Sequence, residues 1–146
     1  MKNVILFVSF VLATSLFWNV DSKRMSFEEI KETLQPVRKI CIDRVGTDPK
    51  MIDEANKGNF VPDRKLQCYF KCMMVMTRVM TKDDKLVEKM FINIAELMVE
   101  EKYTEPFMQT IINCKEIALQ PLEGCELAYE ILKCFYEYNP SLTFLP

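Results

Sequence analysis

The sequence contains no histidine, and its only tryptophan, Trp18, stands near the amino terminus. Serine triads, histidine-paired cysteine nucleophiles and most secreted hydrolases need an imidazole as their base. Zinc sites also use histidine more often than not. The absence of histidine removes most of the usual catalytic machinery, so we expect a protein that is not an enzyme and that holds no metal and no cofactor.

Glycine is scarce as well, with three residues in a chain of 146. Tight hairpins between strands depend on glycine, and the alternation of apolar and polar residues that marks a strand is also missing. The chain has no internal repeat, no low-complexity tract and no long linker. We therefore predict an all-α fold in a single compact domain.

Neither sign of charge is in large excess, because 19 basic residues stand against 21 acidic ones. A nucleic-acid-binding protein needs a clustered basic face, which this balance does not provide. The acidic pairs along the chain fall at helix ends or on polar faces, where capping and solvation explain them. We expect no nucleic-acid partner and no attraction to an anionic membrane.

The first 22 residues have the pattern of a secretory signal peptide. A basic head at Lys2 precedes a run without charge from Val4 to Trp18, and small residues follow before Ser22. The run is short for a membrane span, which takes about 20 residues, and no second run of this kind appears. We predict removal of residues 1–22 and a secreted domain, residues 23–146, without stable membrane insertion.

Apolar residues recur at three- and four-residue steps through most of the remaining chain, which predicts about six amphipathic helices. Ser26 and Glu29 form a capping box for the first helix, which Pro36 should bend or split. Gly46 and Gly58 mark the ends of the first two helices. The predicted ranges are 26–44, 49–56, 63–81, a helix capped by Asp83 and Asp84, a helix opening at 104–106, and a helix from Pro121 to Asn139.

Six cysteines in a small secreted chain indicate three disulfide bonds. Cys68 and Cys72 lie on one predicted helix with their Cβ atoms about 5–6 Å apart, whereas a disulfide needs about 3.5–4.5 Å. Cys125 and Cys134 would be still farther apart along one straight helix. Excluding these two pairs leaves ten of the fifteen possible pairings open, and in all ten Cys68 and Cys72 bind different partners.

The cysteine spacing C-x26-C-x3-C-x41-C-x10-C-x8-C, with "LQCYFKC" and "GCELAYEILKCF", resembles the insect odorant-binding protein family. The resemblance extends over residues 23–146, and the x3 and x8 gaps are its most specific part. It implies three interlocked bonds, Cys41–Cys72, Cys68–Cys125 and Cys114–Cys134, around an internal apolar cavity. Each bond would stabilise the fold by about 3–4 kcal/mol on the chain-entropy model.

The resemblance also implies a function, which is to carry odorants or pheromones through aqueous lymph to olfactory receptors. The same fold can serve as a carrier or scavenger in saliva, venom or reproductive fluid. A saposin-like protein that acts on lipids or membranes is the alternative of a different class, since it too has six cysteines. The expected partners are a small hydrophobic ligand and an olfactory receptor, and the expected state is a monomer or a weak homodimer.

Flexible methionines, together with aliphatic and aromatic residues of the predicted helices, are the candidate walls of the cavity. Hydroxyl groups are the candidates for holding the polar end of a ligand. The apolar tail after the last cysteine should fold back as wall or lid. The candidates are Tyr69, Met73, Met76, Thr77, Met90, Ile94, Met98, Phe107, Met108, Ile111, Tyr129, Leu132, Phe135, Tyr136, Phe144 and Leu145.

The lack of histidine leads to a prediction about pH. Ligand affinity should change little between about pH 7 and pH 5.5, because unperturbed carboxyl groups titrate near pH 4 and no imidazole is present. Titration of a bound fluorescent probe over this range measures the affinity. A sharp loss of affinity near pH 6 would contradict the prediction.

Overall fold

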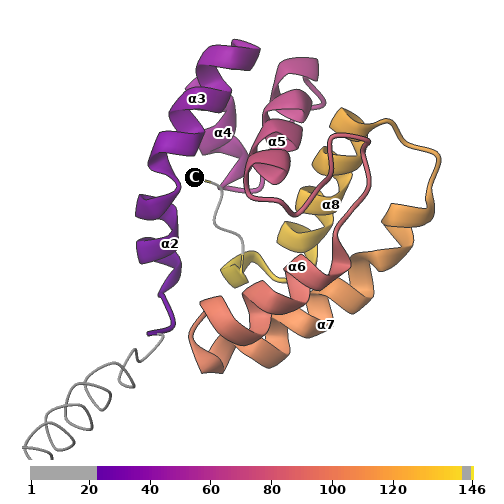
Figure 1. Cartoon of the computed structure of the whole chain (residues 1–146). Coiled ribbons are helices and arrows are strands. Elements are labelled where there is room, and N and C mark those ends of the chain that lie inside the picture. Colours follow the sequence, from indigo (N-terminus) through magenta and orange to yellow (C-terminus); the bar gives the residue numbers. More distant parts are fainter. Residues whose placement is uncertain (1–22, 143–145) are drawn as a thin grey trace, which may run out of the picture.

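The computed structural model describes residues 23–142 and residue 146, and this part of the chain contains seven α-helices and no β-strand (Figure 1). The predicted signal peptide, residues 1–22, lies outside the described residues, as do Phe144 and Leu145. The α-helices are α2 (Phe27–Thr33), α3 (Gln35–Val45), α4 (Pro49–Ala55), α5 (Arg64–Met76), α6 (Glu88–Asn93), α7 (Thr104–Cys114) and α8 (Gly124–Tyr138). Shorter helical segments are a π-helix, Ile94–Met98, and 3-10 turns at Glu101–Tyr103, Lys115–Leu119 and Pro140–Leu142.

The predicted all-α fold is confirmed, and the first predicted helix is split at the proline. The Ser26 hydroxyl accepts a hydrogen bond from the Glu29 main-chain N–H, and the Glu29 carboxylate accepts one from the Ser26 N–H, which completes the capping box. Leu34 ends α2 and begins α3, and Pro36 stands in the first turn of α3, where its missing N–H costs no helical bond. Gly46, at φ 73°, ends α3 as predicted.

The third predicted helix, 63–81, is wrong at its carboxyl end, because α5 stops at Met76. The Thr77 hydroxyl donates a hydrogen bond back to the Met73 carbonyl, and Arg78 adopts a positive φ of 64°. The chain then turns so that Met80 forms an isolated antiparallel bridge with Leu86. The apolar residues continue at helical spacing beyond Met76, so the sequence pattern predicts a longer helix than the backbone forms.

The prediction that Asp83 and Asp84 cap the fourth helix is also wrong. Helix α6 begins only at Glu88, after Val87, whose side chain makes no capping bond. The carboxylate of Asp84 instead accepts a hydrogen bond from the Gly124 N–H at the start of α8 (3.2 Å) and pairs with Lys71 of α5 (2.5 Å). An acidic residue does complement a helix amino terminus here, but the helix is α8, which is 40 residues farther along the chain.

Three disulfide bonds fix the helices to one another. The Cα–Cα distances are 5.7 Å, 4.5 Å and 6.0 Å, and no free cysteine exists in the chain. Helix α5 carries two of the six cysteines and is therefore bonded both to α3 and to α8. The bonds are Cys41–Cys72 between α3 and α5, Cys68–Cys125 between α5 and α8, and Cys114–Cys134 between α7 and α8.

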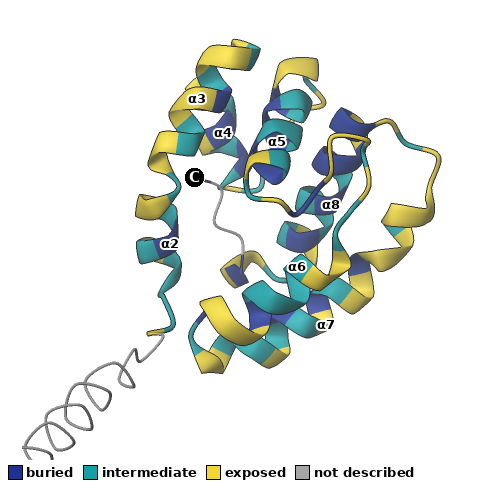
Figure 2. Cartoon of the chain, in the orientation of Figure 1, coloured by how far each residue is buried: buried dark blue, intermediate teal, exposed yellow. Residues whose placement is uncertain are grey.

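Helices α5 and α8 lie side by side at the centre of the fold, with α2 to α4 on one side and α6 and α7 on the other (Figure 1). The buried faces of the central pair point towards each other and towards the neighbouring helices (Figure 2). Leu66, Tyr69 and Phe70 of α5 and Ala128, Tyr129 and Ile131 of α8 belong to this core. The two helices that each carry two disulfide bonds therefore also contribute many of the core residues.

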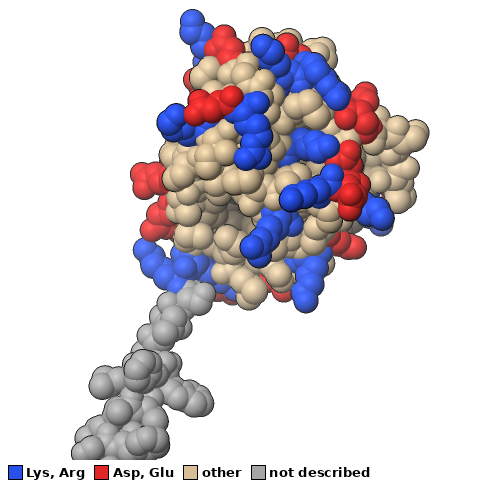
Figure 3. Space-filling model, turned by 45° about the horizontal axis from the view of Figure 1, so that its top comes forward, with Lys and Arg blue, Asp and Glu red and all other residues tan. Residues whose placement is uncertain are grey.

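The surface is polar and of mixed charge. On the face shown in Figure 3, basic and acidic side chains stand around an area without charge. Of the helices in the described part of the chain, none has the length and apolar content to cross a bilayer.

The contact between Asp84 and Gly124 leads to a prediction about stability. A Cβ atom on residue 124 would overlap the Asp84 carboxylate, so Gly124→Ala should destabilise the protein by about 1–3 kcal/mol. In a helix without such a contact, glycine to alanine stabilises by about 0.5–1 kcal/mol. Thermal unfolding measures the difference.

The double variant Asp84→Ala/Gly124→Ala serves as the control. It should be more stable than the sum of the two single changes indicates, because the overlap is gone. A Gly124→Ala variant that melts at a higher temperature than the parent would contradict this account of the contact.

Candidate ligand-binding site

An apolar cavity of about 210 Å³ lies among α2, α5, α6, α7 and α8. Helix α5 crosses one wall with Tyr69, Met73 and Thr77, which are four residues apart and therefore on one face. The other lining residues come from the segments packed around it. They are Met25, Ile30, Thr33, Leu34, Phe70, Met74, Val79, Met90, Phe91, Ile94, Met98, Phe107, Leu132, Phe135, Leu142 and Pro146.

Methionine supplies an unusual share of this wall. Met73 and Met74 are buried on α5, and Met25, Met90 and Met98 join them from the opposite side. An unbranched thioether side chain has three rotatable bonds, and it adapts to guests of different shape at small cost. The methionine-rich wall suits a site that receives several related apolar molecules.

The polar side chains of the lining are two threonines and one tyrosine, and each of their hydroxyl groups donates a hydrogen bond to a main-chain oxygen. Thr77 donates to the Met73 carbonyl (2.8 Å), and Thr33 donates to the Glu29 carbonyl (2.8 Å). The Tyr69 hydroxyl donates to the main-chain oxygen of Pro146 (2.6 Å). What the two threonine oxygens still offer a guest is their lone pairs, which accept hydrogen bonds.

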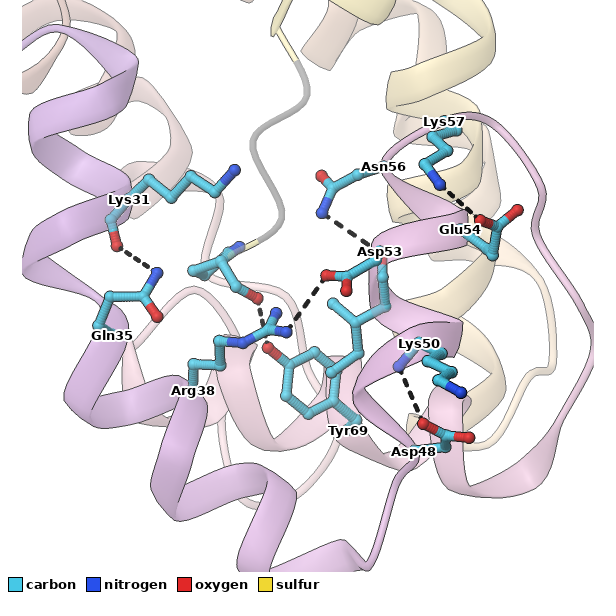
Figure 4. Close-up of polar contacts among 12 residues, drawn as sticks. Lys31, Gln35, Arg38, Asp48, Lys50, Asp53, Glu54, Asn56, Lys57 and Tyr69 are labelled. Carbon is cyan, nitrogen blue, oxygen red and sulfur yellow. Dashed lines mark hydrogen bonds and ion pairs between the residues drawn. The ribbon is translucent and has the colours of Figure 1, made fainter.

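The bond between Tyr69 and Pro146 joins the described end of the chain to the central helix (Figure 4). Arg38 of α3 lies next to this pair and forms an ion pair with Asp53 of α4 (3.3 Å). The Tyr69 side chain is fully buried, and burial raises the pKa of its hydroxyl to about 12, although the nearby Arg38 guanidinium opposes the rise. The phenol is therefore neutral and able to donate at any physiological pH.

Three glutamates have pKa values held below the ordinary range by hydrogen-bond donors. The causes are the Ser26 N–H for Glu29, the Lys57 ammonium for Glu54, and the Arg64 guanidinium for Glu123, whose pKa falls to about 2. Because these pKa values lie below the ordinary range, the three carboxylates stay charged down to pH 5.5. Their contribution to stability is present above the unfolded pKa and is lost only as the pH falls through the lowered folded pKa.

Nine of the sixteen sequence-predicted ligand contacts line the cavity, and they come from five different helical segments and Thr77. The nine are Tyr69, Met73, Thr77, Met90, Ile94, Met98, Phe107, Leu132 and Phe135. Whether they touch a ligand stays a prediction. Phe144 and Leu145, the predicted wall or lid, lie outside the described residues, although Leu142 and Pro146 on either side of them both line the cavity.

The five other predicted contacts do not line the cavity. Met76 is 39% exposed at the end of α5 and faces solvent. The rings of Tyr129 and Tyr136 pack against Phe60, with centroids 5.8 Å and 5.7 Å away. Met108 packs against the core, and Ile111 lines a separate groove. Helical periodicity identifies the buried face of α7 and α8. It does not say whether a residue on that face lines the cavity or packs elsewhere, in the groove or around Phe60.

The sequence reasoning missed the contribution of α2 and of the turn after α5. Ile30 and Leu34 belong to the apolar face of the first predicted helix, 26–44, but were not predicted to line the cavity. Val79 stands in the segment that was predicted as helix. Met25, which lines the cavity, forms a bridge with Val99 that no local pattern signals.

Metal-binding groups do not converge anywhere in residues 23–142. All six cysteines are in disulfides, and one or both members of each acidic pair are in ion pairs: Asp53 with Arg38, Glu54 with Lys57, Asp84 with Lys71 and Glu100 with Lys102. The chemistry that this site offers a guest is apolar contact and a few hydrogen-bond acceptors.

The buried phenol leads to a prediction about alkaline pH. Tyr69 should ionise near pH 12, and because its folded pKa lies above the ordinary 10, its contribution to stability is complete below pH 10 and is lost as the pH rises through 12. The ultraviolet absorbance of the phenolate follows the ionisation. Tyr69→Phe should remove the step near pH 12, whereas Tyr138→Phe, at a 47% exposed ring, should keep it. Loss of the step in the Tyr138 variant alone would contradict the assignment.

Comparison with known proteins agrees with this geometry. A curated relative, general odorant-binding protein 72 of Anopheles gambiae, is 26% identical over 117 residues, which cover 80% of this chain and 96% of the relative. Among solved structures, odorant binding protein 4 of Chrysopa pallens has a TM-score of 0.73 at 28% identity and covers 84% of this chain and 99% of its own. Odorant binding protein 5 of Apis mellifera has a TM-score of 0.76 at 22% identity, with 85% and 100% covered, and so shares the fold.

The family match extends over nearly all of the described chain. Residues 23–138 match the PBP/GOBP family, and the match begins at the residue that follows the predicted signal peptide. The six cysteines, the helical fold and the apolar cavity are consistent with it. The chain belongs to the PBP/GOBP family of insect odorant-binding proteins.

Proposed function

We propose that this protein is a secreted carrier that holds one small hydrophobic molecule, an odorant or a pheromone, in its internal cavity and transports it through aqueous lymph. Support comes from the family and fold, which are those of odorant-binding carriers and not of enzymes. Family membership sets aside the saposin-like alternative. The olfactory receptor is the proposed destination, and a monomer or a weak homodimer is the proposed state.

The observation that carries the proposal is the cavity itself, which is walled by apolar side chains and held by cross-linked helices. A well-packed domain of this size has few voids larger than a water molecule. An apolar void costs packing energy, so its presence inside a disulfide-bonded frame is easiest to explain if a guest fills it.

The energetics suit reversible transport. A guest with about ten buried methylene groups gains roughly 8 kcal/mol by transfer from water. Association costs several kcal/mol, and polar groups of the guest lose hydration. We therefore expect affinity no tighter than about micromolar, which corresponds to roughly −8 kcal/mol and lets the guest leave again.

The hydroxyl arrangement also limits the chemical class of the guest. Since Thr77 and Thr33 already donate hydrogen bonds within the protein, a guest that donates a hydrogen bond meets the acceptor lone pairs of their hydroxyl oxygens. A guest that only accepts must break one of these bonds or remain unpaired, which costs free energy in an apolar site. We therefore propose that alcohols are preferred over ethers and ketones of the same skeleton.

A displacement assay with a fluorescent probe tests this proposal. A medium-chain primary alcohol should bind about two- to tenfold more tightly than its methyl ether, because one hydrogen bond contributes about 0.5–1.5 kcal/mol. The variant Thr77→Val keeps the shape but removes an acceptor, and it should reduce the preference if Thr77 receives the alcohol.

Two results would count against the proposal in different ways. Equal or tighter binding of the ether would contradict the preference for donors but leave the carrier function standing. Failure of every alcohol, ether, terpenoid and fatty acid to displace the probe would contradict the carrier function itself.

A further inference from the structure

A second apolar hollow lies on the other side of the same wall. This groove has a volume of about 390 Å³ and is bounded by α6, α7, the 3-10 turn Lys115–Leu119 and α8. Its floor is apolar, with Leu86, Ile111 and Ile131 among the contributing residues, and its charged side chains are Glu88, Lys115 and Glu116. The cavity described above, at about 210 Å³, is smaller than the roughly 300–1,000 Å³ usual for small-molecule sites.

Two aromatic residues line both hollows. Phe91 of α6 and Phe135 of α8 contribute to the cavity and to the groove, and their ring centroids are 6.0 Å apart with the planes tilted by 42°. Phe135 is held from behind by an edge contact with Phe107, at 5.7 Å. The Phe91–Phe135 pair is therefore a partition between two apolar spaces.

The two halves of this partition are anchored very differently. Phe135 is buried on α8, next to Cys134, and α8 carries two disulfide bonds. Phe91 is half-buried on α6, a six-residue helix without a buried side chain and without a side-chain cap at its amino terminus. Helix α6 runs directly into a π-helix, and no cysteine stands between Cys72 and Cys114.

We infer that Phe91 is a movable partition, and that a guest with a long unbranched hydrocarbon chain displaces it and extends from the cavity into the groove. This inference rests on the proposed function, since it assumes that the cavity holds a guest. The polar head stays near the acceptor oxygen of Thr77, and the tail passes Phe135 towards Ile131 and Ile111. The joined space lies within the usual size range of a small-molecule site.

The inference distinguishes long guests from short ones, because only the long chains reach the groove. Two linear alcohols, hexan-1-ol and hexadecan-1-ol, are measured by displacement of one fluorescent probe. Each methylene that becomes buried should increase affinity about fourfold. The informative quantity is the ratio of the affinity for the long alcohol to that for the short alcohol, because losses common to both cancel.

Two variants should move this ratio in opposite directions. Phe91→Ala removes the partition and should raise the ratio at least fivefold. Ala118→Phe, at an exposed position that lines only the groove, fills the groove and should lower the ratio at least fivefold. The matched control is Ile112→Phe, which enlarges a 51% exposed side chain on α7, the helix just before the turn that holds Ala118, at a position that lines neither hollow, and it should leave the ratio within twofold of the parent.

The outcomes separate this inference from the proposed function. If the parent binds the short alcohol and neither Phe91→Ala nor Ala118→Phe changes the ratio, the partition is not displaced and the inference is wrong. If the parent binds neither alcohol, the proposed function fails and the inference fails with it. Opposite shifts in the two variants, with the control unchanged, would establish the extended site.

Discussion

The fold depends above all on the two disulfide bonds that leave helix α5 in different directions. Cys72 ties α5 to α3, and Cys68 ties it to α8, so this central helix is fixed to neighbours on both of its sides. An internal apolar void weakens a protein by the contacts that its walls lose. Cross-links that restrict the unfolded chain, at about 3–4 kcal/mol each, offset such a loss. The cavity can therefore exist in a domain of modest size because the frame around it is covalent.

The chemistry of the cavity follows from the same helices. At the end of α5 the Thr77 hydroxyl donates a hydrogen bond to the Met73 carbonyl, and the Tyr69 hydroxyl donates one to the main-chain oxygen of Pro146. The bonds that shape the walls therefore also remove the hydrogen-bond donors from them, and a guest meets apolar surface with a few acceptors. Stability and selectivity are in this sense two results of one set of contacts. The half-buried Phe91, on the least anchored helix, is the place where the walls have most freedom to change.

The sequence was most informative where the signal is local or covalent. Four predicted features have a strong short-range cause, and the structure contains all of them. They are the capping box at Ser26, the helix break near Pro36, the helix end at Gly46, and the bonding of Cys68 and Cys72 to different partners. The cysteine pairing itself needed the family resemblance, because geometry alone left ten possibilities.

The structure differs from the sequence-based expectation where a contact outside the local helical pattern decides the backbone path or the neighbours of a side chain. Asp84 was expected to cap the next helix but accepts a hydrogen bond from Gly124 in the first turn of α8, whose capping residue is Glu123. The apolar run after Met76 was expected to be helical but forms a turn that pairs Met80 with Leu86. Met25 entered the cavity wall through a bridge to Val99. For Tyr129 and Ile111 the periodicity identifies the buried face of the helix. Tyr129 on that face packs against Phe60 and Ile111 lines the groove, and neither lines the cavity.

The most direct test of the central claim is to measure probe binding before and after the disulfides are reduced under otherwise native conditions. If the covalent frame keeps the cavity open, the oxidised protein binds an apolar fluorescent probe that an odorant-like alcohol displaces, and the reduced protein loses this displaceable binding together with its cooperative thermal unfolding. A reduced protein that binds the probe as tightly as the oxidised protein, with the same displacement by the alcohol, would contradict the account.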